Sequence, residues 1–143
     1  MDEKLSVEDI LAIQELIARY AYHADEGEHE AVSQLLACAD LYAQGVLIAS
    51  KDAALLKQKF SAHPRPEGVG RRHVTTNIII DRLGSDTAAA TSCFIWTEAA
   101  PGSPPRMLQC GVYRDRFQKL EGAWRFTERR AITDGVAQAP TAS

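Results

Sequence analysis

The sequence lacks the features of a membrane-bound or secreted protein. No apolar run approaches the roughly 20 residues that a membrane-spanning helix needs. The first four residues do not begin a hydrophobic signal core. Cys38, Cys93 and Cys110 are an odd number of cysteines with no close pairing, which fits reduced thiols rather than a disulfide framework. We therefore expect a cytoplasmic protein that does not bind membranes.

Several site types are also missing from the sequence. The net charge is -3, so there is no basic excess of the kind that nucleic-acid binding requires. No glycine-rich phosphate loop follows a strand, and there is no Gly-x-Ser-x-Gly motif. The histidines do not have the spacing of a zinc site or of an iron-binding facial triad; they are His23, His29, His63 and His73. We expect no metal, no cofactor and no nucleic-acid partner.

The first part of the chain has a helical pattern. Ser6 is a suitable N-cap, and apolar residues then recur at helical spacing until Gly27, which predicts one long helix. Two short helices are predicted over residues 28–36 and 51–60, the second of them capped by Ser50. Residues 40–48 between them are expected to form irregular chain with a short strand.

The second part of the chain has an extended pattern. Strands are predicted over residues 72–82, 87–97, 106–119 and 123–132, and the loop at 61–70 is rich in proline and glycine. Helices followed by a meander indicate an α+β domain, and such long antiparallel strands must curl. We expect a cone-shaped curved antiparallel sheet with the N-terminal helices packed across its open side. Residues 1–136 then form a single domain, and residues 137–143 form a flexible C-terminal tail.

His73 is the first candidate for chemistry. Strand alternation places it on one face with Thr75, Asn77 and Ile79, while Val74, Thr76, Ile78 and Ile80 lie on the other. A neutral imidazole that titrates near pH 7 is a suitable general base. The alternative is a histidine at the protein surface, at the edge of the sheet.

Several segments resemble a known family. They are AIQELIARY at residues 12–20 followed by Asp25, RHVTTN at 72–77, GVYRD at 111–115, GAWRF at 122–126 and the arginine pair at 129–130. In order and spacing they resemble SnoaL-like proteins of the nuclear transport factor 2-like (cystatin-like) superfamily. That superfamily includes scytalone dehydratase, bile-acid dehydratase, hexachlorocyclohexane dehydrochlorinase, ketosteroid isomerase and non-catalytic members. The resemblance implies the cone-shaped fold, but a fold shared by so many activities does not select one of them.

The resemblance also implies roles for two helix residues. In the dehydratases and the dehydrochlorinase, an aspartate at the place of Asp25 pairs with the strand histidine, so Asp25 would orient His73. Tyr20 resembles a dehydratase tyrosine that polarises a substrate carbonyl. On an ideal helix Tyr20 and Asp25 point about 140° apart, so both reach one pocket only if the helix end unwinds or the pocket wraps around it. The alternatives are a solvated Asp25 and a Tyr20 that belongs to the core.

A further group of residues is expected to shape a substrate pocket. Asn77 would hydrogen-bond a ligand, and Phe94 and Trp96 would form an aromatic wall. Tyr113 lies on the third long strand, and Arg129 would steer an anion or a leaving group. Arg130 has the opposite facing, and the sequence does not decide which of the two arginines points inward.

These residues together suggest a small-molecule lyase or isomerase. It would be dehydratase-like and would use an Asp–His general base in an apolar pocket, on a cyclic, carbonyl-bearing substrate that is apolar, aromatic or polycyclic. One alternative is a non-catalytic module that binds a small hydrophobic ligand. Another is a structural β subunit of a ring-hydroxylating dioxygenase. Because the outer sheet face is largely apolar, we expect a homodimer or homotrimer, with an interface made partly polar by Asp81, Arg82, Arg114 and Arg116.

Overall fold

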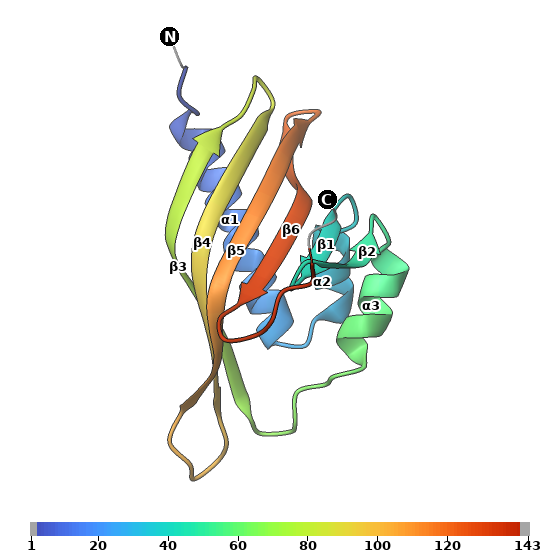
Figure 1. Ribbon diagram of the computed structural model, residues 1–143, viewed down its shortest axis with the longest axis vertical. Coiled ribbons are helices and arrows are strands. Elements are labelled where there is room, and N and C mark those ends of the chain that lie inside the picture. Colours follow the sequence, from blue (N-terminus) through green and yellow to red (C-terminus); the bar gives the residue numbers. More distant parts are fainter. Residues whose placement is uncertain (1–2, 141–143) are drawn as a thin grey trace.

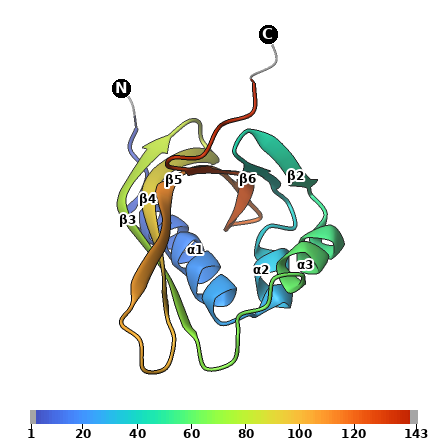
Figure 2. The same ribbon diagram turned by 60° about the horizontal axis from the view of Figure 1, so that its bottom comes forward.

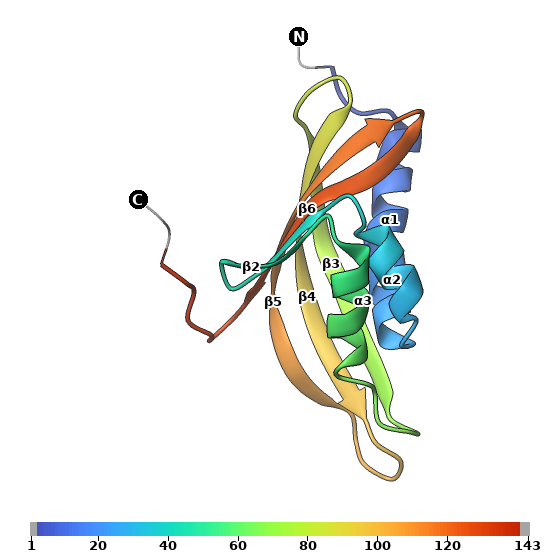
Figure 3. The same ribbon diagram turned by 90° about the vertical axis from the view of Figure 1, so that its right-hand side faces the viewer.

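The computed structural model describes residues 3–140, and within them three helices lie on one face of a six-stranded sheet (Figure 1). The side view in Figure 3 separates the two layers, with the helices on one side of the strands. In Figure 2 the long strands curl around α1. The predicted α+β fold, with helices packed across a curved sheet, is confirmed. None of the helices in this part of the chain is long and apolar enough to cross a membrane.

Helix α1 (Val7–Asp25) begins where the sequence predicts. The Ser6 hydroxyl accepts a hydrogen bond from the backbone N–H of Asp9 at 3.0 Å, which satisfies one of the free donors at the helix start. The apolar stripe faces the sheet, and Ile13 and Ile17 are fully buried. The helix stays regular through Asp25, its last residue. Its regular geometry therefore fixes the positions of the side chains in its last turn, including that of Asp25.

The two short helices form the rest of the helical layer. Helix α2 spans His29–Leu35 and helix α3 spans Ala53–Ser61. The prediction that Ser50 caps the third helix is wrong, since the side chain of Asp52 accepts from the N–H of Leu55 and makes the cap. Ser50 ends a strand instead, and its hydroxyl donates to Asp40 at 2.6 Å.

The sheet has the strand order β2-β1-β6-β5-β4-β3. Its long strands are β3 (Gly70–Arg82), β4 (Thr87–Ala99), β5 (Arg106–Leu120) and β6 (Ala123–Thr133), joined as an antiparallel meander. The segment expected to hold one short strand forms a hairpin, β1 (Asp40–Ala43) and β2 (Val46–Ser50). Because β1 pairs parallel to β6, the sheet is mixed and not purely antiparallel.

A β-bulge breaks the predicted alternation of β3. Register with β4 is lost between Thr76 and Ile79, and Asn77 takes a positive φ of 54°. As a result Ile78, and not Ile79, packs against the core, while Ile79 is 61% exposed. The expectation that Asn77 and Ile79 share the face of His73 is wrong beyond Thr76, because the bulge shifts the phase of the strand.

The outer face of the sheet keeps some apolar side chains exposed. Val74 on β3 pairs with Ile95 on β4, and they are 49% and 37% exposed. On the side of the β1–β2 turn, the N–H of Ala139 donates to the carbonyl of Gln44 at 2.8 Å. The predicted tail at 137–143 thus touches the sheet in its first residues, and its last three lie outside the described residues.

Candidate active site

His73 on β3 contacts Asp25 at the end of α1. The two are joined by two hydrogen bonds: one between the ring Nδ1 and Oδ1 at 2.5 Å, and one from the His73 backbone N–H to Oδ2 at 2.8 Å. The Asp25 side chain is 3% exposed and that of His73 is 15% exposed. An ionised carboxylate only accepts hydrogen bonds, so the neutral imidazole must carry its hydrogen on Nδ1. Its Nε2 is then unprotonated and has no hydrogen-bond partner within residues 3–140.

The position of Asp25 explains why it needs this partner. A negative charge in the last turn of a helix is disfavoured by the helix dipole, and burial adds a desolvation cost. The two N–H donors from His73 compensate both. In return, the carboxylate fixes the ring orientation of His73 and favours its protonated form during proton transfer.

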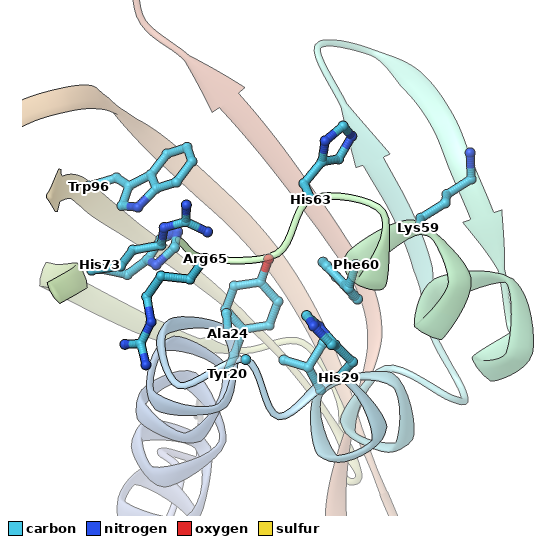
Figure 4. A pocket seen from close by; sticks show the side chains of 12 residues that line it. Tyr20, Ala24, His29, Lys59, Phe60, His63, Arg65, His73 and Trp96 are labelled. Carbon is cyan, nitrogen blue, oxygen red and sulfur yellow. The ribbon is translucent and has the colours of Figure 1, made fainter. Parts of the chain in front are cut away.

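A cavity of about 200 Å³ lies beside this pair. Its wall is formed by the end of α1, by α2, by α3 with the loop after it, by the start of β3 and by the end of β4. The residues that line it are Tyr20, Ala24, Gly27, His29, Val32, Lys59, Phe60, His63, Arg65, Arg71, His73 and Trp96. In Figure 4, His73 and Trp96 lie on one side of the Tyr20 hydroxyl, and Phe60 and His63 lie on the other. The proline-rich loop at 61–70 contributes His63 and Arg65 to this wall.

The structure resolves the geometric conflict between Tyr20 and Asp25. Tyr20 lines the cavity, whereas Asp25 reaches His73 from behind and does not line it. The end of α1 therefore does not unwind. Burial raises the pKa of the Tyr20 hydroxyl, so the group keeps its proton at neutral pH and is available as a hydrogen-bond donor.

Arg129 is not part of the cavity wall. Its side chain is fully buried and makes a double hydrogen bond with the equally buried Asp115, at 2.8 and 3.0 Å. The guanidinium lies 4.1 Å from the ring centre of Tyr20 and 3.8 Å from that of Tyr113. Burial raises the pKa of the Asp115 carboxyl and the paired guanidinium offsets this only in part, while Asp115 in turn raises the pKa of Arg129. Arg129 thus supports Tyr20 from behind and does not contact a ligand directly.

Arg130 faces the other way. Its guanidinium lies 3.8 Å from the ring centre of Tyr42 on β1 and donates to Glu128 at 3.1 Å. The choice between the two arginines that the sequence left open is therefore settled in favour of Arg129 as the inward residue.

The predicted aromatic wall is only partly present. Trp96 lines the cavity, and its ring stacks on that of His73 with centroids 5.3 Å apart and planes 9° apart. Phe94 is buried one layer deeper, where it stacks on Tyr113 at 4.5 Å. Gly111 makes room for it, because a Cβ at that position would lie 2.9 Å from the Phe94 ring. Neither Phe94 nor Tyr113 lines the cavity.

Asn77 lies outside the site altogether. The bulge turns it to the exposed surface, where its side-chain oxygen accepts a 3.4 Å hydrogen bond from Thr76. The expectation that it hydrogen-bonds a ligand is not supported by this position, because that expectation assumed an unbroken strand.

Sequence reasoning missed the polar residues at the mouth of the cavity. These come from α2, α3, the following loop and the start of β3, and include Lys59, His63, Arg65 and Arg71. The only signal for them was the proline-rich and glycine-rich loop at 61–70, whose composition does not single out a side chain. Within residues 3–140, no group of three His, Cys, Asp or Glu side chains is placed to hold a metal ion.

Comparison with known proteins agrees with this architecture. The family description "SnoaL-like domain" matches residues 5–130. The comparison with curated proteins gives no match. A variant of Rv3472, a Mycobacterium tuberculosis protein of unknown function, is 29% identical, with 90% of this chain and 73% of that chain covered and a TM-score of 0.75.

Two structures from Novosphingobium aromaticivorans are also similar. A nuclear transport factor 2-like protein with a cystatin-like fold is 24% identical, with 92% of this chain and 86% of that chain covered and a TM-score of 0.74. A candidate scytalone dehydratase is 22% identical, with coverage of 96% and 91% and a TM-score of 0.71. The chain therefore belongs to the SnoaL-like family, and its fold is the cystatin-like fold of nuclear transport factor 2-like proteins.

Proposed function

We propose that this protein is a small-molecule lyase or isomerase of the dehydratase type, with His73 as its general base. The observation that carries the proposal is the contact between His73 Nδ1 and Asp25 beside a cavity that His73 itself lines. The 22% identical candidate scytalone dehydratase supports the fold alone. The chemistry therefore rests on the side chains.

The proposed reaction begins with proton abstraction. His73 Nε2 takes a proton from a carbon next to the substrate carbonyl, and the C–H electron pair moves into the enolate. The imidazolium that forms is stabilised by Asp25 at Nδ1, and the same carboxylate holds the ring in place. General-base catalysis of this kind contributes about 10²–10⁴-fold in rate.

Tyr20 is the candidate electrophile. Its hydroxyl faces the cavity, and its raised pKa keeps the proton on oxygen, so it donates a hydrogen bond to the developing enolate oxygen. A donor fixed in a water-poor site stabilises such charge more than water does, because it does not have to reorient. The Arg129 guanidinium on the Tyr20 ring holds the phenol in this position.

The enolate then has two outcomes. If a hydroxyl group is attached to the next carbon, its C–O bond breaks, the His73 imidazolium protonates it, and water leaves with a new double bond in the product. If the substrate instead carries a double bond between the β and γ carbons, proton abstraction gives a dienolate, the imidazolium returns the proton to the γ carbon, and the double bond moves to the α,β position. Both routes restore the neutral base, and neither requires an external oxidant or reductant.

The test uses proton exchange, because it needs no known substrate. In D₂O, the protein should accelerate loss of the α-hydrogen NMR signal of single-ring ketones such as cyclohexanone and cyclopentanone. His73→Gln should lower this acceleration by about 10²–10⁴-fold, the usual contribution of a general base. Asp25→Asn should also lower it, because the ring then loses its anionic partner.

His23→Gln is the matched control. His23 bonds Glu28 at 3.1 Å and does not line the cavity, so exchange in this variant should equal that of the wild type. If wild type and His73→Gln exchange the ketones at the same rate, His73 is not the base. A cavity that still bound ligands would then favour the non-catalytic binding module.

A further inference from the structure

The mouth of the cavity has a charge opposite to that of the whole chain. The chain carries a net charge of -3, yet three cavity-lining residues are cations and none is Asp, Glu, Asn or Gln. The cations are Lys59 on α3, Arg65 in the loop after it and Arg71 on β3. A ligand in this cavity meets many hydrogen-bond donors and few acceptors.

The carboxylates nearby do not cancel this charge. Arg71 is matched, because it donates twice to Glu98 at 2.7 and 3.0 Å. Arg65 shares a single carboxylate, Glu26, with Arg72: its own contact is 3.8 Å, whereas that of Arg72 is 3.0 Å. Two arginines, Arg65 and Arg72, therefore share one carboxylate, which leaves one positive charge without a partner.

Lys59 adds a second unbalanced charge. Its ammonium makes no ion pair with any residue between 3 and 140, although Lys57, two residues earlier on the same helix, is bound to Glu30 at 2.8 Å. With Arg65 weakly paired and Lys59 unpaired, the cavity mouth attracts an anion, and the Asp25 carboxylate behind His73 offsets only part of this positive charge.

The inner part of the cavity is suited to one flat ring. Trp96 and Phe60 stand on opposite sides of the Tyr20 hydroxyl in Figure 4, and the volume of about 200 Å³ is below the 300–1,000 Å³ of usual ligand pockets. A ring beside Trp96 would place a substituent toward the loop that carries Arg65.

From these observations we infer that the substrate is a small, single-ring carboxylate, whose acidic group is bound at the mouth by Lys59 and Arg65 while its ring lies against Trp96. That this ligand is a substrate rests on the proposed function, whereas the preference for an anion concerns binding only. It is therefore tested separately from catalysis.

The probes are benzoate and benzamide, which have nearly the same shape and differ in charge. The chain has two tryptophans, so the ¹⁵N-labelled protein gives two indole N–H signals. Trp96 lines the cavity, whereas Trp124 is held by Asp9 at 2.7 Å and is remote from it, so Trp124 is an internal control. The signal of Trp96 is identified by its loss in Trp96→Phe.

Benzoate should shift the Trp96 signal and leave that of Trp124 in place, with an affinity about tenfold greater than that of benzamide, as expected for one charge-assisted hydrogen bond. The double variant Lys59→Gln, Arg65→Gln should remove this preference without weakening benzamide. Lys57→Gln, on the same helix but outside the cavity, should keep it.

The inference is overturned if the two probes bind equally, if benzamide binds more tightly, or if neither moves the Trp96 signal. It is also overturned if the double variant retains the full preference for benzoate. His73→Gln separates the two proposals: a preference for benzoate that survives in this variant supports the anion site, whether or not ketone exchange is lost.

Discussion

The buried pair Arg129–Asp115 allows a quantitative prediction. Both side chains have no exposed surface, so removing either one leaves the other charge unpaired in the interior. Breaking such a pair costs about 3–5 kcal/mol, more than most single substitutions. In a domain of this size, that corresponds to a fall in Tm on the order of 10 °C. We therefore expect Arg129→Met and Asp115→Leu each to be strongly destabilised.

The double variant distinguishes the reason for this loss. With both charges replaced by apolar side chains, no unpaired charge remains, so Arg129→Met, Asp115→Leu should be more stable than either single variant. The assay is urea unfolding followed by circular dichroism, with the m value checked for constancy. Single variants that lose less than about 1 kcal/mol, or a double variant that loses the sum of both, would refute the reasoning.

Three other predictions follow from separate features. Hydrogen bonds from an indole on β6 and an ammonium on β5 lower the pKa of Asp9 to about 2; the folded pKa is then below the unfolded value of about 4, so Asp9 stabilises the fold above that pH and the benefit is lost as pH falls toward 2. The Tm advantage of wild type over Asp9→Asn should shrink in that window, and a constant difference would contradict this. Gly111→Ala should cost about 3 kcal/mol or more in urea unfolding, because its Cβ would overlap the backbone carbonyl oxygen of Ile132 and lie 2.9 Å from the Phe94 ring, and unchanged stability would contradict it. We also propose a homodimer or homotrimer through the outer sheet face around Val74 and Ile95; light scattering should show Ile95→Lys as a monomer, and a monomeric wild type would oppose the proposal.

Local patterns predicted most of the fold. The start of α1 followed from Ser6 and the apolar spacing after it, and the four long strands followed from alternation between turn residues. The parallel pairing of β1 with β6 was not predictable, because 88 residues separate the paired residues and no local signal encodes such pairing. The cap of α3 was misplaced because two cap-forming residues lie close together, and Ser50 is used by β2.

For the site residues on the strands, prediction from the sequence was limited by breaks in the alternation of inward and outward side chains. His73 and Trp96 follow simple alternation and line the cavity, whereas Asn77 lies at a bulge. Asparagine tolerates a positive φ, which was the one available hint. On β6, alternation from Phe126 would turn Arg130 inward, but Thr127 is an extra residue opposite the step from Arg116 to Phe117 on β5, and it changes the phase of β6 so that Arg129 lies inside.

In the proposed mechanism, His73 presents an unprotonated Nε2 to the cavity because Asp25 holds the hydrogen on Nδ1. Long-range ¹H–¹⁵N NMR of the histidine rings measures this directly, with His73 identified by the loss of its signals in His73→Gln. Above the pH at which the ring becomes neutral, the account predicts a protonated Nδ1 and a bare Nε2 for His73. A neutral His73 with its hydrogen on Nε2 would contradict the account, because the nitrogen that faces the substrate could not then accept a proton.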